Sequence, residues 1–520
     1  MEPRLLPRLV PADAKAGLAD SDVVNDRSAG PLHGLRLTSG TRGSVPPGPS
    51  RDTDTDRLAA RNVGRLFAVC TGSKPLSDQL FWSIVAIVAI PLAGWPWARV
   101  LGLRGALLAA AAWLLGCALL TMMMLLLSAV NGRFSRASLA LIWLVLVAAG
   151  LLIGRTKVKG GSESRPLPGD RLQLPLAALA LVVVFVQVMY VWLAAVRVPL
   201  GSFDSWSLWE YKGRRFWLDG MISGGVLRDH SLIFAHPAYP PLLSLLITWV
   251  YTWAGAAEPS LMKPLFPLFF CALLCGFYAA VRARLGVSMA LLALGALALL
   301  PRMADYAGAG LADVPMTAFL VGSAAAYCAY RESSDRRAWI AAGLFLGMAA
   351  LIKRDALPYL GAGILTIALV ERQWKRVLWF AGPAIAVCAP WYLYARLGGL
   401  QDRDFLPFTL TNLGAHLDRL GPIARLFILN LFATDEWSIL WYVVLAALVL
   451  AIPRKTIKGP ALLLLILLPL AGFVGSLSLS AWPDYTLHVR TSLDRLLLGA
   501  APFALWFVCE QLAPRGARRA

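Results

Sequence analysis

Long apolar runs recur along most of this 520-residue chain and restrict its fold more than any other feature. Many are 17 to 25 residues long, enough for a helix to cross a hydrocarbon core of about 30 Å. Because a helix satisfies its backbone hydrogen bonds internally, such runs predict an all-α, polytopic membrane protein. Fourteen runs are candidates, at 81–98, 105–130, 138–154, 172–196, 240–255, 264–281, 287–300, 311–330, 338–352, 356–370, 375–395, 437–452, 460–479 and 496–512.

The formal net charge of +19 does not by itself indicate a nucleic-acid-binding protein. A nucleic-acid-binding protein of this basicity would concentrate Lys and Arg on a polar domain, and the sequence contains no such domain. The 19 Trp residues fit a membrane protein, since indole rings favour the membrane interface. We therefore expect membrane lipids as partners and no nucleic acid.

Cysteine and histidine give no sign of a metal site. Six of the seven cysteines fall inside apolar runs and are expected to pack as small hydrophobic residues. The five histidines show no HxxxH or HExxH spacing, so the pattern predicts no dedicated zinc site.

Composition divides the chain into five parts. The first is polar and lacks amphipathic periodicity, and we expect it to be disordered or to lie upstream of the true start. Two long polar loops interrupt the rest, and long loops in compact proteins commonly carry function. The predicted parts are a tail at 1–79, three accessory membrane helices at 80–171, a catalytic core at 172–395 with an outer loop at 197–263, a second outer loop at 396–436 and C-terminal membrane helices at 437–520.

The positive-inside rule predicts the orientation. The basic stretch 155–171 is placed in the cytoplasm, which puts the loop after 172–196 on the outer face. If the short run at 240–255 does not cross, the cytoplasmic loops hold 19 Lys and Arg against 6 acids, whereas the outer stretches hold 15 of each sign. The sequence therefore predicts about 13 crossings and a non-crossing segment near 240–255.

This topology places nearly all the polar residues that could do chemistry on one face, as an active site at a membrane surface requires. In the first loop, SFDSWSLWEYKGRRFW contains Asp204, Trp209 and Lys212. Asp204 could act as a general base while Lys212, Lys353, Arg354 and Arg490 hold the phosphate of the donor. The alternative is an amphipathic helix in the interface, with solvated charges and Asp204 as its N-cap.

Four further motifs follow on the same face. Each also has a purely structural explanation, as a stiff loop, a helix cap or an internal ion pair. Lys353 and Arg354 stand out, because two cations in an outer turn oppose the positive-inside rule and would suit a lipid-linked phosphate. The candidate residues are His236 and Tyr239 in HPAYPP, Asp305 and Asp313 near AGAGLADVP, Lys353 and Arg354 in LIKRDALPYL, and His488 and Arg490 before DRLLLGAAP.

Taken in order, SFDSWSLWEYKGRRFW, HPAYPPLLSLL, AGAGLADVP, LIKRDALPYL and DRLLLGAAP resemble the bacterial GT-C-fold glycosyltransferases related to protein O-mannosyltransferases and aminoarabinose transferases, grouped as glycosyltransferase family 39. The resemblance covers about residues 172–510. It implies an inverting sugar transfer from a polyprenyl-phosphate donor on the extracytoplasmic face of a cell membrane. It also implies a catalytic acid in the first outer loop, which corresponds to Asp204 here.

The resemblance leaves several features open. Lipid, glycan and protein are all candidate acceptors, and the expected location is a bacterial inner membrane with the active site facing outward. Many relatives carry an Asp-Glu pair where this chain has Asp204 and Ser205, so no cofactor is certain and a divalent metal ion stays open.

Two other functions remain compatible with the sequence. A transferase resembling O-antigen ligases, which uses a diphosphate-linked donor, would depend on His416 or His488. A flippase or transporter for a lipid-linked sugar would instead favour ionisable residues on broken helices at mid-membrane.

The topology is testable with single cysteines introduced at 257–262. We expect an impermeant thiol reagent added from outside to label them, because the segment at 240–255 returns the chain to the outer face. Labelling only after the cytoplasmic side is opened would show that this segment crosses the membrane.

Overall fold

The computed structural model describes residues 75–155, 174–222, 224–330, 336–400, 404–452 and 457–513. This part of the chain is helical throughout, with one isolated antiparallel bridge between Phe405 and Ser480. The predicted all-α class is therefore confirmed. The predicted tail at 1–79 lies outside the described residues apart from its last five, as does nearly all of the basic stretch 155–171.

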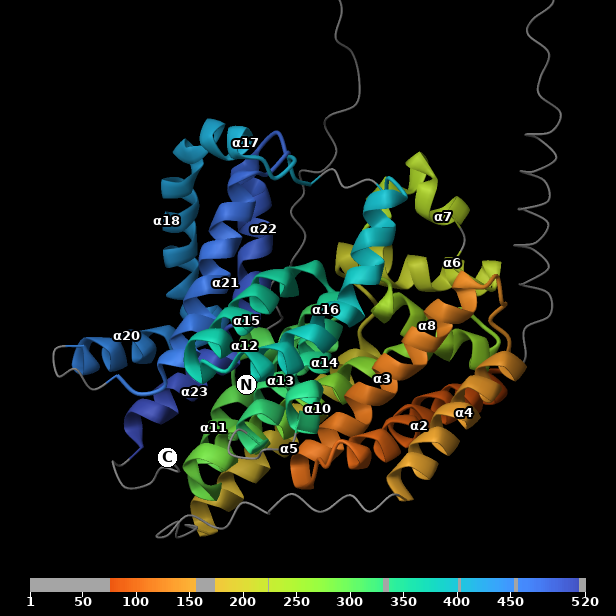
Figure 1. Cartoon of the computed structure of the whole chain (residues 1–520), viewed down its shortest axis with the longest axis horizontal. Helices are drawn as coiled ribbons and strands as arrows, with labels where there is room; N and C mark the ends of the chain where they lie inside the picture. The colour runs from red at the N-terminus through yellow and green to blue at the C-terminus, as the bar shows by residue number, and fades with distance from the viewer. Residues whose placement is uncertain are drawn as a thin grey trace, which may run out of the picture. The chain divides into compact units, whose positions relative to one another are not determined.

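Each predicted apolar run is a helix or a pair of helices (Figure 1). The three accessory helices are α2 (Leu76–Val100), α3 (Gly105–Ala129) and α4 (Arg136–Arg155), followed by α5 (Leu174–Arg197). The next helices are α10 (Leu265–Leu285), α11 (Val287–Ala298), α12 (Pro301–Gly308), α13 (Asp313–Tyr330), α14 (Arg336–Ile352), α15 (Leu357–Glu371) and α16 (Trp374–Leu397). The C-terminal helices are α20 (Leu440–Ala451), α21 (Pro460–Ser478), α22 (Tyr485–Leu498) and α23 (Ala501–Leu512).

The two long loops contain short helices. The first holds a π-helix, η1 (Ser205–Glu210), then α6 (Tyr211–Asp219), α7 (Gly224–Arg228), a 3-10 helix η2 (His230–Ala235), α8 (Leu242–Ala254) and α9 (Pro259–Met262). The second holds α17 (Leu410–Ala415), η4 (Leu417–Arg419), α18 (Leu420–Leu431) and α19 (Thr434–Trp437). A further 3-10 turn, η3 (Arg354–Ala356), joins α14 to α15.

Among the described residues, seven helices are long and apolar enough to cross a membrane, or nine if α11 with α12 and α22 with α23 each count as one bent span. The four other predicted crossings are shorter or less apolar helices: α13, α14, α15 and α20. At 12 residues, α20 is only about 18 Å long, so it does not span a membrane alone. The amphipathic α18, which the apolar runs did not reveal, precedes it.

Helix α8 matches the segment expected not to cross. It has 13 residues, about 20 Å of helix, and nearly all of them are buried. It packs against α2, α3 and α6, so it lies inside the protein instead of facing lipid. Its length agrees with the predicted non-crossing segment at 240–255.

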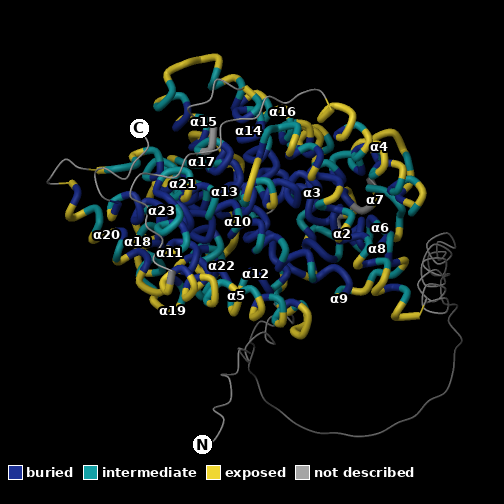
Figure 2. Tube along the Cα trace, turned by 90° about the horizontal axis from the view of Figure 1, so that it is seen from below, coloured by how far each residue is buried: buried dark blue, intermediate teal, exposed yellow. Residues whose placement is uncertain are grey.

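Burial follows the expected contrast between protein and lipid contacts (Figure 2). Helices α10 and α13 lie at the centre, and α3 packs on both, which joins the accessory helices to the rest. In contrast, α4 and α5 expose large apolar side chains such as Leu152, Leu179 and Phe185. Exposed apolar side chains on long helices are what a lipid environment favours.

Helices α14 and α16 approach closely at two glycines. A Cβ on Gly343 would collide with the carbonyl oxygen of Phe380, and a Cβ on Gly347 would collide with that of Ala384. Small residues at such crossings let two backbones meet in a membrane.

This crossing gives a stability prediction. Gly343→Ala should lower the free energy of unfolding by about 1–3 kcal/mol, the usual cost of overpacking. Gly382→Ala is the matched control, because a Cβ on this α16 glycine meets nothing within 4 Å. Thermal unfolding of the detergent-purified variants measures both, and equal midpoints would contradict the close crossing.

Candidate active site

A cavity of about 890 Å³ opens where the two long loops meet the ends of α14, α21 and α22. Its volume lies within the roughly 300–1,000 Å³ range of small-molecule sites. Five segments far apart in the sequence form its wall. Its polar and charged lining residues include Ser202, Asp204, His236, Tyr239, Lys353, Arg354, Asp355, Asp404, Ser476, Trp482, His488, Thr491, Ser492 and Arg495.

Five ionised side chains form a continuous network at this cavity. Arg495 forms an ion pair with Asp204, and its Nε lies 3.5 Å from Oδ2 of Asp313. Lys353 Nζ lies 2.8 Å from Oδ1 of Asp313 and 2.6 Å from Oδ2 of Asp355. The charges therefore alternate from Asp204 to Asp355, with the fully buried Asp313 at the centre.

Local structure explains how these residues meet. Asp313 is the first residue of α13, and Lys353 immediately precedes the η3 turn. Asp204 immediately precedes the π-helix η1, a rare conformation that often occurs at functional sites. Arg495 lies in the last turn of α22. Four elements therefore contribute their ends to one network.

The network keeps Lys353 charged. Burial by itself would lower the pKa of Lys353, as would the neighbouring Arg495. Asp313 and Asp355 outweigh both effects and raise the pKa above its ordinary value. Lys353 is therefore a fixed cation at the cavity wall.

A second polar group faces the same cavity. His236 Nδ1 lies 3.0 Å from Asp404 Oδ2, and the indole Nε1 of Trp482 donates a hydrogen bond to Asp404 Oδ1 at 3.2 Å. Burial raises the pKa of Asp404, but the hydrogen bonds from His236 and Trp482 and the charge of His236 lower it below its usual range. Asp404 is therefore an ionised carboxylate that links the first long loop to the segment before α22.

Aromatic rings complete this side. His488 stacks on Trp482 with a centroid distance of 4.6 Å, and its Nδ1 lies 2.8 Å from Ser480 Oγ. The Arg354 guanidinium lies over the rings of Tyr239 and Phe405, at 4.5 and 5.1 Å from their centroids. The cavity thus combines a charged region with an aromatic one.

Lys212 has a different place from the one its sequence suggested. It is buried behind the cavity wall, where Nζ donates to the carbonyl oxygen of His236 at 3.2 Å and lies 5.2 Å from the centre of the Trp209 ring. Burial lowers its pKa to about 7. His236 has a φ of +46°, a strained value for a residue with a side chain. The position of Lys212 therefore suits holding His236 in place.

The structure brings together most, but not all, of the residues singled out from the sequence. Asp204, His236, Tyr239, Lys353, Arg354 and His488 line the cavity, and Asp313 lies directly behind it. Trp209 is buried behind Tyr239, with ring centroids 6.1 Å apart. Three others lie outside the lining: Asp305, which accepts a hydrogen bond from Tyr190, the exposed Arg490, and His416, whose Nδ1 lies 2.7 Å from the carbonyl oxygen of Asn412.

Sequence reasoning gave no role to Asp404 or Trp482. Asp404 follows a run of charged residues in the second long loop, and Trp482 begins the WPDY segment, so both carried a weak signal. Their proximity depends on backbone pairing, in which Ala481 N donates to Asp404 O and Leu406 N to Leu479 O. Such pairing between segments 75 residues apart has no sequence signature.

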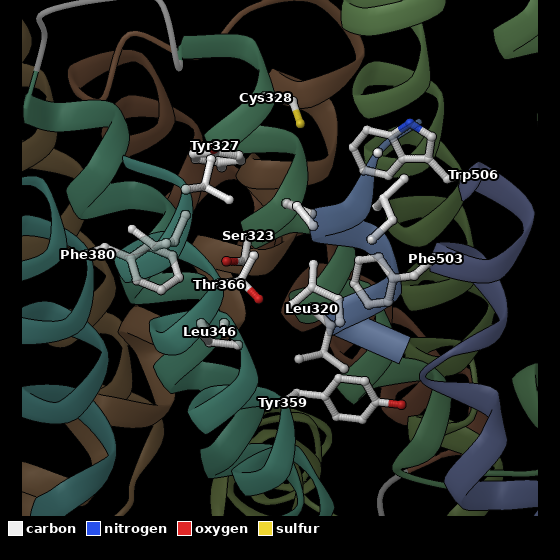
Figure 3. Close-up of a pocket in the computed structure, with 18 of the residues that line it drawn as sticks. Leu320, Ser323, Tyr327, Cys328, Leu346, Tyr359, Thr366, Phe380, Phe503 and Trp506 are labelled. Atoms are coloured by element: carbon white, nitrogen blue, oxygen red, sulfur yellow. The ribbon is translucent and has the colours of Figure 1, made fainter. Parts of the chain in front are cut away.

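A second, smaller cavity of about 110 Å³ lies between α13, α14, α15, α21 and α23 (Figure 3). Figure 3 shows the rings of Tyr359, Phe380, Phe503 and Trp506 around it. An ion pair between Arg284 and Glu510 lies at its wall. Its mainly apolar lining offers little for catalysis.

Within the described ranges, no three His, Cys, Asp or Glu side chains gather as a metal site would require. The cavity's carboxylates are instead held by Arg495, Lys353 and His236.

Comparison with known families gives one match. Residues 238–394 match the model of the dolichyl-phosphate-mannose-protein mannosyltransferase family, which confirms the resemblance noted from the sequence. The matched segment contains Tyr239, Asp313, Lys353 and Arg354 but ends before Asp404 and Arg495. No curated protein and no solved structure matches the chain. With the apolar helices, the match indicates a multi-pass membrane glycosyltransferase of the GT-C type.

The buried Lys212 predicts a pH-dependent stability. Its pKa of about 7 lies below the 10.5 of an exposed lysine, so the folded protein binds this proton less tightly than the unfolded chain. The burial cost is fully present below pH 7, and the free energy of unfolding rises from there to about pH 10. Lys212→Met removes this titration, so its stability relative to wild type should fall as pH rises.

Thermal unfolding midpoints between pH 6 and 10 measure this difference. Lys375→Met is the control, because Lys375 is exposed and should give a pH-independent difference. A constant difference for Lys212→Met would show that Lys212 is hydrated.

Proposed function

We propose that this chain is an inverting glycosyltransferase that moves a sugar from a polyprenyl-phosphate donor to an acceptor hydroxyl on the extracytoplasmic face of the membrane. The observation that carries the proposal is the network at one open cavity, in which Arg495 and Asp313 connect Asp204 to Lys353. A carboxylate and a fixed cation joined by such a network suit proton removal and phosphate stabilisation.

Lys353 and Arg354 are the proposed phosphate ligands. Both line the cavity, and Arg354 stacks on Tyr239 in a way that orients its planar guanidinium. Arg495 takes the role first considered for Arg490, since it lines the cavity whereas Arg490 is exposed. Lys212 supports the site through the carbonyl group of His236.

Asp204 is the proposed general base. Its carboxylate accepts the proton of the acceptor hydroxyl as that oxygen forms a bond to the anomeric carbon. The bond from this carbon to the phosphate oxygen breaks, and its electron pair stays on the departing polyprenyl phosphate. Attack from the face opposite the phosphate inverts the anomeric configuration. Arg495 orients the Asp204 carboxylate through their ion pair until the acceptor arrives.

The arrangement of the loops supports an outward-facing cavity. Loops expected in the cytoplasm meet one another away from it: Arg284 pairs with Glu510 at 3.4 Å, and Lys458 Nζ donates to the carbonyl oxygen of Ala513 at 2.6 Å. The cavity instead gathers segments from the two outer loops and the turn at Lys353. The positive-inside prediction requires the loops to divide in this way into a cytoplasmic set and an outer set.

The proposal predicts that Asp204→Asn reduces transfer by about 10²- to 10⁴-fold, the usual contribution of a general base. Asparagine has nearly the same shape and can still accept a hydrogen bond from Arg495, so the fold should be retained. Transfer is measured with radiolabelled polyprenyl-phosphate mannose and purified protein in lipid nanodiscs.

Asp418→Asn is the matched control. Asp418 is an exposed carboxylate on the second long loop, outside the cavity lining, and its loss should leave transfer unchanged. Full activity of the folded Asp204→Asn protein would remove Asp204 from the role of base.

A further inference from the structure

The indole ring of Trp482 forms a rigid plate in the cavity wall. His488 stacks on this ring at an interplanar angle of 13°, and the indole Nε1 of Trp482 donates a hydrogen bond to Asp404. Its backbone N–H also donates to Ser480 Oγ, which contacts His488 as well. Trp482 nevertheless keeps 37% of its surface exposed. A ring held on one side and partly exposed is ready to bind a flat ligand without further ordering.

Hydrogen-bonding groups border this plate. Asp404 accepts a hydrogen bond from Trp482 through Oδ1 and contacts His236 Nδ1 through Oδ2, so both carboxylate oxygens are held beside the plate. His236 uses Nδ1 for Asp404, which leaves Nε2 as its second polar atom. Both residues line the cavity beside Trp482. The plate therefore has acceptors and a donor at its edge.

This combination fits a sugar ring better than the other ligands the cavity could receive. The C–H groups on one face of a pyranose stack on an aromatic ring, while its hydroxyls bind carboxylate and imidazole groups at the edge. A phosphate would be repelled by Asp404, which its neighbours keep ionised. An isoprenoid chain would leave Asp404 and His236 without hydrogen bonds to it.

We propose that Trp482, Asp404 and His236 form a subsite for a pyranose ring. The proposal rests on the proposed glycosyltransferase function and assigns sugar binding to three residues that lie outside the matched segment 238–394. The ring could belong to the donor, as the sugar being transferred, or to a glycan acceptor, and the two sources share this chemistry.

Binding of methyl hexopyranosides tests the subsite directly. Wild-type protein in nanodiscs is titrated with methyl α-mannopyranoside, α-glucopyranoside and α-galactopyranoside, and saturation-transfer NMR reports which ring protons contact it. At least one glycoside should bind through its C–H face. Trp482→Ala should weaken that binding about tenfold, which corresponds to loss of about 1.4 kcal/mol.

Three variants keep the outcome interpretable if Trp482→Ala unfolds. Trp482→Phe keeps an aromatic face but removes the bond to Asp404, and should give an intermediate loss. Asp404→Asn should weaken glycoside binding but leave the same ring protons in contact with the protein. Trp206→Ala is the matched control, because Trp206 is a partly exposed tryptophan of the first loop outside the lining, and its loss should have no effect.

Unchanged binding in both Trp482 variants, or no binding of any glycoside to wild type, would overturn the subsite. Either result together with normal transfer from polyprenyl-phosphate mannose would leave the proposed function standing. Failure of transfer with intact glycoside binding would instead refute the proposed function alone.

The source of the ring is assigned by kinetics. Hydrolysis of polyprenyl-phosphate mannose by water needs no acceptor, so a raised KM of Trp482→Phe in this reaction identifies the donor sugar. A normal KM for hydrolysis, with weaker competition between a methyl glycoside and the acceptor, identifies a glycan acceptor.

Discussion

A fully buried carboxylate, Asp313, dictates how the ends of several helices are arranged. An ionised group removed from water is stable only when opposite charges and hydrogen bonds replace its hydration. Lys353 and Arg495 supply those charges from the turn after α14 and from α22. Because each cation also contacts a second carboxylate, the requirement spreads outward to Asp355 and Asp204. Removing Lys353 or Arg495 would leave the buried Asp313 with only one counter-ion, so the centre of the network depends on both cations.

The cavity follows from this network and from a second link between loops. Asp404 connects His236 of the first loop with Trp482 before α22, and Trp391 of α16 donates to the carbonyl oxygen of Ala238. These contacts hold the aromatic part of the cavity wall in place. The ion network forms the charged part. Two differently built surfaces thus meet in one space, one suited to charge and the other to a flat polar ligand. A transferase needs both, because it must stabilise a phosphate and orient a sugar.

The sequence predicted the helices well because lipid solubility demands long apolar runs, whatever they pack against. It also predicted the one-sided clustering of Asp204, Lys353 and their neighbours, since loop charge records orientation. It could not show that Lys212 is buried, because the helix carrying it has the composition of a solvated interfacial helix. Nor could it predict the pairing of Asp404 with Trp482, which depends on long-range backbone contacts. Properties set by the solvent are therefore readable from the sequence, whereas those set by a specific distant partner are not.

The balance of charge in the network bears on the proposed reaction. Asp204, Asp313 and Asp355 against Lys353 and Arg495 leave one negative charge, and Arg354 brings the sum to zero. During transfer, Asp204 would lose its charge on taking a proton, while the phosphate would gain one as its sugar leaves. Charge therefore moves across the cavity without accumulating in it. Arg495, no longer attracted by an ionised Asp204, would become available to the phosphate at the moment its charge increases. An ion pair that weakens as the leaving group forms would stabilise the transition state more than the bound donor, which is the condition for catalysis.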